Sequence, residues 1–185
     1  MAVDRIILGI DPGTQVMGYG LIADKGKKLE LIALDVFRFS YKDPQALRLK
    51  RIFSSVLELI DQYHPDELAV EAPFYGKNVQ SMLKLGRAQG VAMAAGLYRD
   101  IPIFEYSPRR IKQSITGNGN SSKEQVAGML LNLLKLESLP KMLDATDAVA
   151  VAVCHYYQRE PAQTGKSYSG WKNFLDQNPG RLSKK

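Results

Sequence analysis

Four acidic residues stand where predicted strands end or a predicted helix begins, each next to an apolar run. Asp11 and Glu71 each close a short run of aliphatic residues, and Asp144 and Asp147 open a long apolar segment. A carboxylate beside a hydrophobic core costs free energy unless it is paired or bound to a metal ion. Magnesium and manganese prefer such hard oxygen ligands. The pattern therefore indicates a metal site, provided that the fold brings the four acids together.

The spacing within the second pair is helical. Asp144 and Asp147 are three residues apart, so they lie on one helical face, which Val151 and Cys154 continue toward the interior. An ordinary alternative is that Asp144 caps the helix and Asp147 favours the positive end of the helix dipole. Acids at strand ends are equally ordinary in turns. The coincidence of three elements that end or begin in an acid favours a shared site.

Such a cluster suits phosphodiester hydrolysis. Two divalent ions about 3.5–4 Å apart can activate a water molecule and stabilise the leaving oxygen. In that arrangement Asp11 would bridge both ions, Glu71 would bind one, and the Asp144/Asp147 pair would bind the other. Because its candidate partners are all acids, we expect divalent ions, and not side-chain cations, to neutralise Asp11. The chemistry indicated is that of a metal-dependent nuclease.

The elements that must carry these acids follow from hydrophobic periodicity and turn residues. Strands are expected over 6–10, 16–23, 29–39, 67–71 and 103–105, the first three as an antiparallel meander. Helices are expected after Asp43-Pro44, which would cap the first one, and then over 78–98, from Ser107-Pro108, from a Ser121/Glu124 capping box to 136, and over 144–157. Strands followed by alternating strands and helices predict an α/β domain with a mixed sheet and helices on both faces.

A stripe of small residues marks the predicted helix over 78–98. Gly86, Gly90 and Ala94 recur at four-residue spacing. Glycine costs about 1 kcal/mol in a helix interior, so a stripe of this kind indicates close approach by another element. That element could be a second copy of the chain or the protein's own sheet.

Composition sets the broad class. The chain has 185 residues, 45% of them hydrophobic, and a formal charge of +6, which favours an anionic partner such as nucleic acid. We expect one domain over 1–158 and a basic, mobile tail over 159–185. No apolar run is long enough to span a membrane. The single cysteine, Cys154, fits a reducing, cytoplasmic compartment, and we expect it to be buried. The two histidines, His64 and His155, are expected to be structural.

Basic residues are spread over three of the predicted elements. Any one group of them would ordinarily be a solvated face. Together with the acidic cluster, they are interpreted as contacts to DNA phosphates: Lys77, Lys84, Arg87, Arg109, Arg110, Lys112 and Lys123.

Several motifs in a fixed order resemble the RuvC Holliday-junction endonucleases, which have the ribonuclease H-like fold. The resemblance covers residues from about 6 to 155 and rests on these pieces: Gly-Ile-Asp-Pro-Gly-Thr at 9–14, Glu71 with Phe74, Leu-Lys-Leu-Gly-Arg-Ala at 83–88, Lys112-Gln113 and Asp-Ala-Thr-Asp-Ala at 144–148. It implies a five-stranded mixed sheet and a nuclease that resolves four-way DNA junctions by paired symmetric nicks, in recombination and repair.

The resemblance also implies roles for individual residues. Asp11, Glu71, Asp144 and Asp147 would be the catalytic ligands of two Mg²⁺ ions, with Mn²⁺ as an alternative. Lys112 and Lys123 would lie near the scissile phosphate, and Phe74 would stack on bases at the crossover. The helix with the glycine stripe would form a homodimer, and a branch-migration motor of RuvA and RuvB would be the protein partner in a bacterial, nucleoid-associated setting. Ala72-Pro73 departs from the family pattern and bears on how Phe74 is presented.

Two other function classes compete. Asp11-Pro-Gly-Thr with Gly18-Tyr-Gly20 resembles the phosphate loop of sugar kinases and actin-like ATPases, but these need a second phosphate loop, and the chain is too short for a second such domain. A DNA-binding module without catalysis would gain nothing from acids that repel phosphate at its centre. Cleavage of a four-way junction, ATP hydrolysis and binding without a nick would separate the three hypotheses.

Overall fold

The computed structural model describes residues 5–26, 28–73, 78–136 and 143–158. The predicted tail over 159–185 lies outside these ranges, so the predicted domain boundary stays a prediction. The elements, in chain order, are β1 (Arg5–Asp11), β2 (Val16–Asp24), β3 (Leu29–Arg38), α1 (Gln45–Tyr63), β4 (Glu67–Glu71), α2 (Val79–Tyr98), β5 (Ile103–Tyr106), α3 (Pro108–Thr116), α4 (Lys123–Leu134) and α5 (Leu143–Tyr157).

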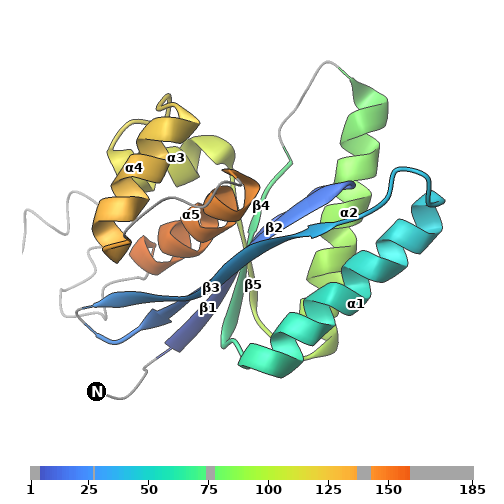
Figure 1. The fold of residues 1–185 in the computed structure, drawn as a ribbon, viewed down its shortest axis with the longest axis horizontal. Helices are drawn as coiled ribbons and strands as arrows, with labels where there is room; N and C mark the ends of the chain where they lie inside the picture. The colour runs from blue at the N-terminus through green and yellow to red at the C-terminus, as the bar shows by residue number, and fades with distance from the viewer. Residues whose placement is uncertain (1–4, 27, 74–77, 137–142, 159–185) are drawn as a thin grey trace, which may run out of the picture.

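The strands of the described ranges form one five-stranded sheet in the order β3-β2-β1-β4-β5 (Figure 1). The first three strands form the predicted antiparallel meander, with Asp11 opposite Gly18. Strands β4 and β5 run parallel to β1, so β1 and β4 end at the same edge of the sheet. The mixed sheet expected from the sequence is confirmed, and its topology brings Asp11 and Glu71 to one edge.

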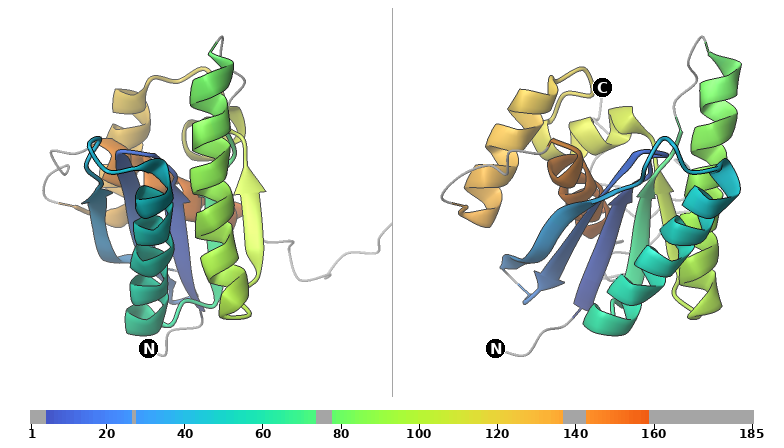
Figure 2. Two further views of the ribbon diagram at one scale, coloured as in Figure 1. Left: turned by 90° about the vertical axis from the view of Figure 1, so that its right-hand side faces the viewer. Right: turned by 45° about the vertical axis from the view of Figure 1, so that its right-hand side comes forward.

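Helices cover both faces of the sheet, as predicted. Helices α1 and α2 pack on one face through a core that includes Leu8, Ile10 and Ile52, and helices α3, α4 and α5 cover the other (Figure 2). Successive side chains of a strand point to opposite faces. Residues 5, 7, 9 and 11 of β1 and residues 67, 69 and 71 of β4 consequently share the face that α5 covers.

Three glycines let α5 lie directly on the backbone of the sheet. A Cβ atom added to Gly9 would come within 2.2 Å of the Ala148 carbonyl oxygen, and one added to Gly18 within 2.0 Å of the Asp144 carbonyl oxygen. A Cβ at Gly20 would meet the Val149 side chain at 2.4 Å. Real Cβ contacts are never so short, so any larger residue here would push α5 away from the sheet.

Two predicted helix caps are wrong. Helix α1 begins after Pro44, which itself holds the N-cap position and makes no side-chain cap, while Asp43 pairs with Arg51. The proline side chain has no hydrogen-bond acceptor, so Pro44 cannot cap the helix through its side chain. The capping box of α4 is formed by Ser122 and Gln125, one residue later than predicted.

The neighbouring residue explains the shift at α4. Ser121 is buried and its hydroxyl hydrogen-bonds with that of Thr116, so it serves the preceding loop. Helix α4 also ends at Leu134, two residues before the predicted end. Both serines fit an N-cap by type, and only the path of the loop selects between them.

The structural predictions for the two histidines and the cysteine are confirmed. His64 is the left-handed C-cap of α1, and both Cys154 and His155 are buried in α5. Within the described part of the chain, none of the helices has the length and apolar character that crossing a bilayer requires.

Candidate active site

Three elements deliver the four predicted acids to one place. Asp11 ends β1, Glu71 ends β4, and Asp144 and Asp147 lie in the first turns of α5. Because side chains alternate in direction along a strand, Asp11 and Glu71 point to the face on which α5 begins. Asp144 lies inside α5 as the structure describes it, and not at its cap, so the capping interpretation of this residue is wrong.

Carboxylate oxygens of Asp11, Asp144 and Asp147 all lie within 4.8 Å of one another. Glu71 lines a cavity of about 190 Å³ together with Asp11 and Asp147. We call these four residues the acidic cluster. Part of the cavity wall is apolar, because Pro108, Ile111, Val126 and Ala150 also line it; sequence patterns did not point to these four residues.

The pKa values of two acids in the cluster are raised well above their usual range. Burial, together with the charges of Glu71 and Asp147, raises the pKa of Asp11 to about 8. Burial and the charge of Asp147 raise the pKa of Glu71 to about 7. Like charges in a partly buried site disfavour each other's ionised form. Asp11 and Glu71 therefore hold protons near neutral pH, and a cation that binds there must displace them.

A lysine shares in this charge balance. Lys123, the first residue of α4, donates a hydrogen bond to Asp147 and lowers the pKa of Asp11. Partial burial lowers the pKa of Lys123, but the hydrogen bond to Asp147 and the nearby acids outweigh this and raise it overall. The expectation that no side-chain cation neutralises Asp11 holds only in part: Lys123 reaches over the cavity from α4 and lowers the pKa of Asp11, although this pKa stays raised.

The donor set fits divalent metal ions. The site offers carboxylate oxygens, without histidine or thiolate among the residues that line the described cavity. Hard oxygen donors with raised pKa values, set around a space open to solvent, suit Mg²⁺ or Mn²⁺.

The predicted DNA-binding residues separate into groups. Lys112 of α3 and Lys123 of α4 line the acidic cavity. Lys84 and Arg87 are exposed on α2, and Arg109 is exposed on α3. The remaining predicted residue of α3, Arg110, donates a hydrogen bond to Gln158, beyond the C-terminal end of α5, and does not line the cavity. The other two predictions, Phe74 and Lys77, lie outside the described residues.

Comparison with known proteins identifies the family. The family model for crossover junction endodeoxyribonuclease RuvC matches residues 7–155. The chain belongs to the RuvC family. The RuvC protein of Christiangramia forsetii is 61% identical over 97% of this chain and 93% of its own length, and that of Cytophaga hutchinsonii is 58% identical over 97% and 89%.

A solved structure of Thermus thermophilus RuvC in complex with Holliday junction substrate is also similar. It is 33% identical, covers 83% of this chain and 93% of its own, and has a TM-score of 0.78. The yeast mitochondrial Holliday junction resolvase Ydc2, at 14% identity and a TM-score of 0.61, shares the fold. The resemblance and the fold inferred from sequence are confirmed, and membership of a nuclease family removes the ATPase hypothesis.

Proposed function

We propose that this RuvC-family chain cuts four-way DNA junctions at the acidic cluster, with Asp11, Glu71, Asp144 and Asp147 as ligands of two Mg²⁺ ions. The observation that carries the proposal is the convergence of carboxylates from β1, β4 and α5 in one cavity. Bound there, the ions would supply an activated water and stabilise the leaving oxygen of the phosphodiester. Mn²⁺ has the same ligand preference and could replace Mg²⁺.

The chain's own residues have distinct tasks in this proposal. The acids place negative charge where the ions bind, and the raised pKa values of Asp11 and Glu71 are relieved by that binding. Lys112 and Lys123, at the edge of the same cavity, are suited to hold the scissile phosphate. Their positive charge offsets the repulsion that the acids would otherwise exert on DNA. Phe74 is proposed, from the family resemblance, to stack on bases at the crossover.

The test uses a synthetic four-way junction with Mg²⁺, and the Asp11→Asn and Asp147→Asn variants. We expect paired symmetric nicks from the wild type and their loss in both variants, while the gel shift of the junction without metal persists. A junction that is bound but never nicked, whichever metal is added, would indicate a binding module.

We also propose that the chain is a homodimer through helix α2. Val79, Leu83 and Leu97 are large apolar side chains that are 65%, 51% and 61% exposed on this helix. Between them, a Cβ atom added to Gly86 or Gly90 would meet nothing within 4 Å. No contact with the described part of the chain accounts for the glycine stripe, and we infer a second copy as its partner.

The dimer test follows from those open spaces. Gly90→Leu should leave the monomer folded, because its side chain meets no neighbour, but should separate the dimer. Gly128→Leu on α4 is the matched control, since a Cβ there also meets nothing. Sedimentation velocity should show a monomer for Gly90→Leu and a dimer for Gly128→Leu. A dimer in both variants would contradict the proposal.

Family membership further supports a cytoplasmic, nucleoid-associated role with the RuvA and RuvB branch-migration motor. Cleavage of a junction that the motor is moving should be faster than cleavage of a static junction. Equal rates would count against this partnership.

A further inference from the structure

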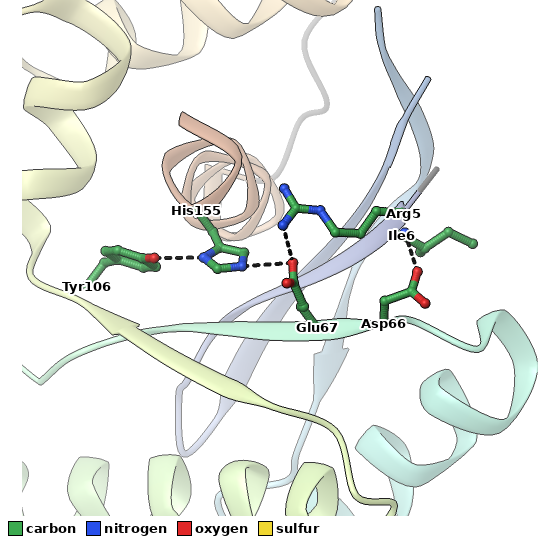
Figure 3. Close-up of polar contacts among 6 residues, drawn as sticks. All are labelled: Arg5, Ile6, Asp66, Glu67, Tyr106 and His155. Atoms are coloured by element: carbon green, nitrogen blue, oxygen red, sulfur yellow. Dashed lines mark hydrogen bonds and ion pairs between the residues drawn. The ribbon is translucent and has the colours of Figure 1, made fainter. Parts of the chain in front are cut away.

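A second polar group lies at the opposite end of the elements that carry the acidic cluster. His155 of α5 accepts a hydrogen bond at Nδ1 from the Tyr106 hydroxyl at 2.7 Å, and its Nε2 lies 3.0 Å from Glu67 Oε2 (Figure 3). Arg5 Nη1 lies 2.6 Å from the same Glu67 oxygen. We call Arg5, Glu67, Tyr106 and His155 the far-end network; Tyr106 itself ends β5 opposite Glu71, and its hydroxyl reaches back to His155.

Each element of the acidic cluster reappears in this network. Arg5 begins β1, which ends at Asp11, and Glu67 begins β4, which ends at Glu71. His155 lies near the end of α5, which opens with the other two acids. The four-residue step from Glu67 to Glu71 along β4 spans about 13 Å. The eight residues from position 147 to 155 span about 12 Å of helix. The helix and strands therefore run side by side over the same length, with a polar group at each end.

The rotation of α5 about its own axis is not selected by an apolar stripe, so a polar contact is needed to fix it. Residues 145, 146 and 148–155 are all buried, so the helix lacks the single apolar stripe that fixes the rotation of an amphipathic helix. Gly9, Gly18 and Gly20 set how closely α5 approaches the sheet from Asp144 to Ala152, but not at its last residues. The two hydrogen bonds of His155, in contrast, are directional, and both form in only one arrangement of the helix.

The histidine at the centre of the network has a partner at each ring nitrogen, whereas Nε and Nη2 of Arg5 are buried without a hydrogen-bond partner among the described residues. Burial lowers the pKa of His155, although the hydrogen bond to Glu67 opposes this. A neutral imidazole with its proton on Nε2 donates to Glu67 and accepts from Tyr106, so each ring nitrogen has one partner. Glu67 also carries the countercharge of Arg5. Rotation of α5 would break bonds to two strands at once.

We propose that the far-end network is a positioning device, which holds α5 in the rotation and height that place Asp144 and Asp147 against Asp11 and Glu71. This inference rests on the proposed metal-dependent function of the acidic cluster. Its residues do not touch the reacting atoms. They act through the helix and strands between the two ends, and a shift of about 1 Å at a reacting centre can cost about 100-fold in rate.

The test compares four variants of the full chain, the fourth of which, His155→Gln, is a conservative rescue. His155→Phe keeps a ring beside Phe104 but loses both hydrogen bonds, and Tyr106→Phe loses one hydroxyl. Asp66→Asn is the matched control: Asp66 neighbours Glu67 and accepts a hydrogen bond from the Ile6 backbone N–H at 2.7 Å, but does not reach α5 (Figure 3). The measurements are Mn²⁺ affinity by electron paramagnetic resonance, the cleavage rate at saturating junction and metal, junction affinity without metal, and Tm.

We expect His155→Phe to weaken Mn²⁺ binding and slow saturated cleavage by about tenfold each, within the range seen when groups that orient metal ligands are removed. Tyr106→Phe should show a smaller loss in the same direction, and Asp66→Asn none. Junction affinity without metal should stay within twofold. His155→Gln, whose amide can still donate to Glu67, should recover part of the loss.

A lower Tm with unchanged Mn²⁺ affinity and unchanged saturated cleavage would reduce the network to a structural role and overturn the proposal. Tyr106→Phe keeps this outcome accessible if His155→Phe does not fold. Failure of the wild type itself to bind Mn²⁺ or cut junctions would instead refute the proposed function.

Discussion

The two ends of α5 rest on the same face of the sheet, yet their charges are arranged in opposite ways. At one end Glu71 and Asp11 lie among other acids, and their pKa values rise to about 7 and 8. At the other end Glu67, only four residues earlier on the same strand, has Arg5 and His155 as partners. Glu67 has cationic and hydrogen-bonding partners in direct contact, whereas the pKa of Glu71 stays raised although Lys123 and Lys112 lower it.

The two groups of acids have opposite effects on the stability of the fold. Buried polar groups in satisfied networks specify a structure, whereas unrelieved like charges destabilise it and persist where a ligand relieves them. Substitutions at one end of α5 at a time should therefore change cleavage and stability differently.

The largest effect is expected from the same chemical change made at each end. Asp11→Asn should lower the cleavage rate by at least about 1,000-fold, or roughly 4 kcal/mol of barrier. It should also raise the Tm of the metal-free protein at pH 8, because it removes a repelled carboxylate. Glu67→Gln should cost about tenfold in rate at most and lower Tm, because Arg5 loses its countercharge.

Gel-based cleavage assays and differential scanning calorimetry measure both quantities. A lower Tm in both variants would remove the distinction between the two ends.

A smaller effect is expected at the lysine that crosses the acidic end. Lys123→Ala should slow cleavage by about 100-fold, the usual cost of losing one preorganised electrostatic contact. Mn²⁺ should bind at least as tightly as in the wild type, since a cation that competes for Asp147 is gone. Calorimetric titration with Mn²⁺ and single-turnover cleavage would check this. Weaker Mn²⁺ binding would instead make Lys123 an organiser of the ligands.

A separate effect is expected on the pH dependence of stability without metal. The pKa of Asp11 is about 8 in the folded protein, against about 3.9 in an unfolded chain. Between these values the folded state binds more protons, so stability present near pH 4 is lost as the pH rises toward 8. Glu71, at about 7, adds to this loss.

Thermal melts of the metal-free wild type should therefore show Tm falling over that window, at about 2–4 °C per kcal/mol. Asp11→Asn should give a flatter curve, and saturating Mg²⁺ should restore Tm most strongly at pH 8. A wild-type Tm that rises toward pH 8 would contradict the assigned electrostatics.

Local patterns were sufficient for most elements, because strands and helices differ in hydrophobic period. They were insufficient at helix starts, where Ser121 and Ser122 are both suitable caps and the buried bond to Thr116 decides. The close approach of α5 to the sheet had a signal in the sequence, since Gly18 and Gly20 stand two apart inside a strand. Such glycines often mark close backbone approach. Gly9 lies beside these glycines only because the register of β1 and β2 places it opposite Gly20.

The sequence by itself determined which residues could bind metal, because apolar runs that end in Asp11 and Glu71 leave each carboxylate at a strand end, and helical spacing pairs Asp144 with Asp147. Only the tertiary structure decided how those acids are balanced. Lys123 reaches Asp147 from another helix, and His155 meets Glu67 across 88 positions of the chain. Contacts of that range depend on how α5 lies on the sheet, which no local pattern encodes.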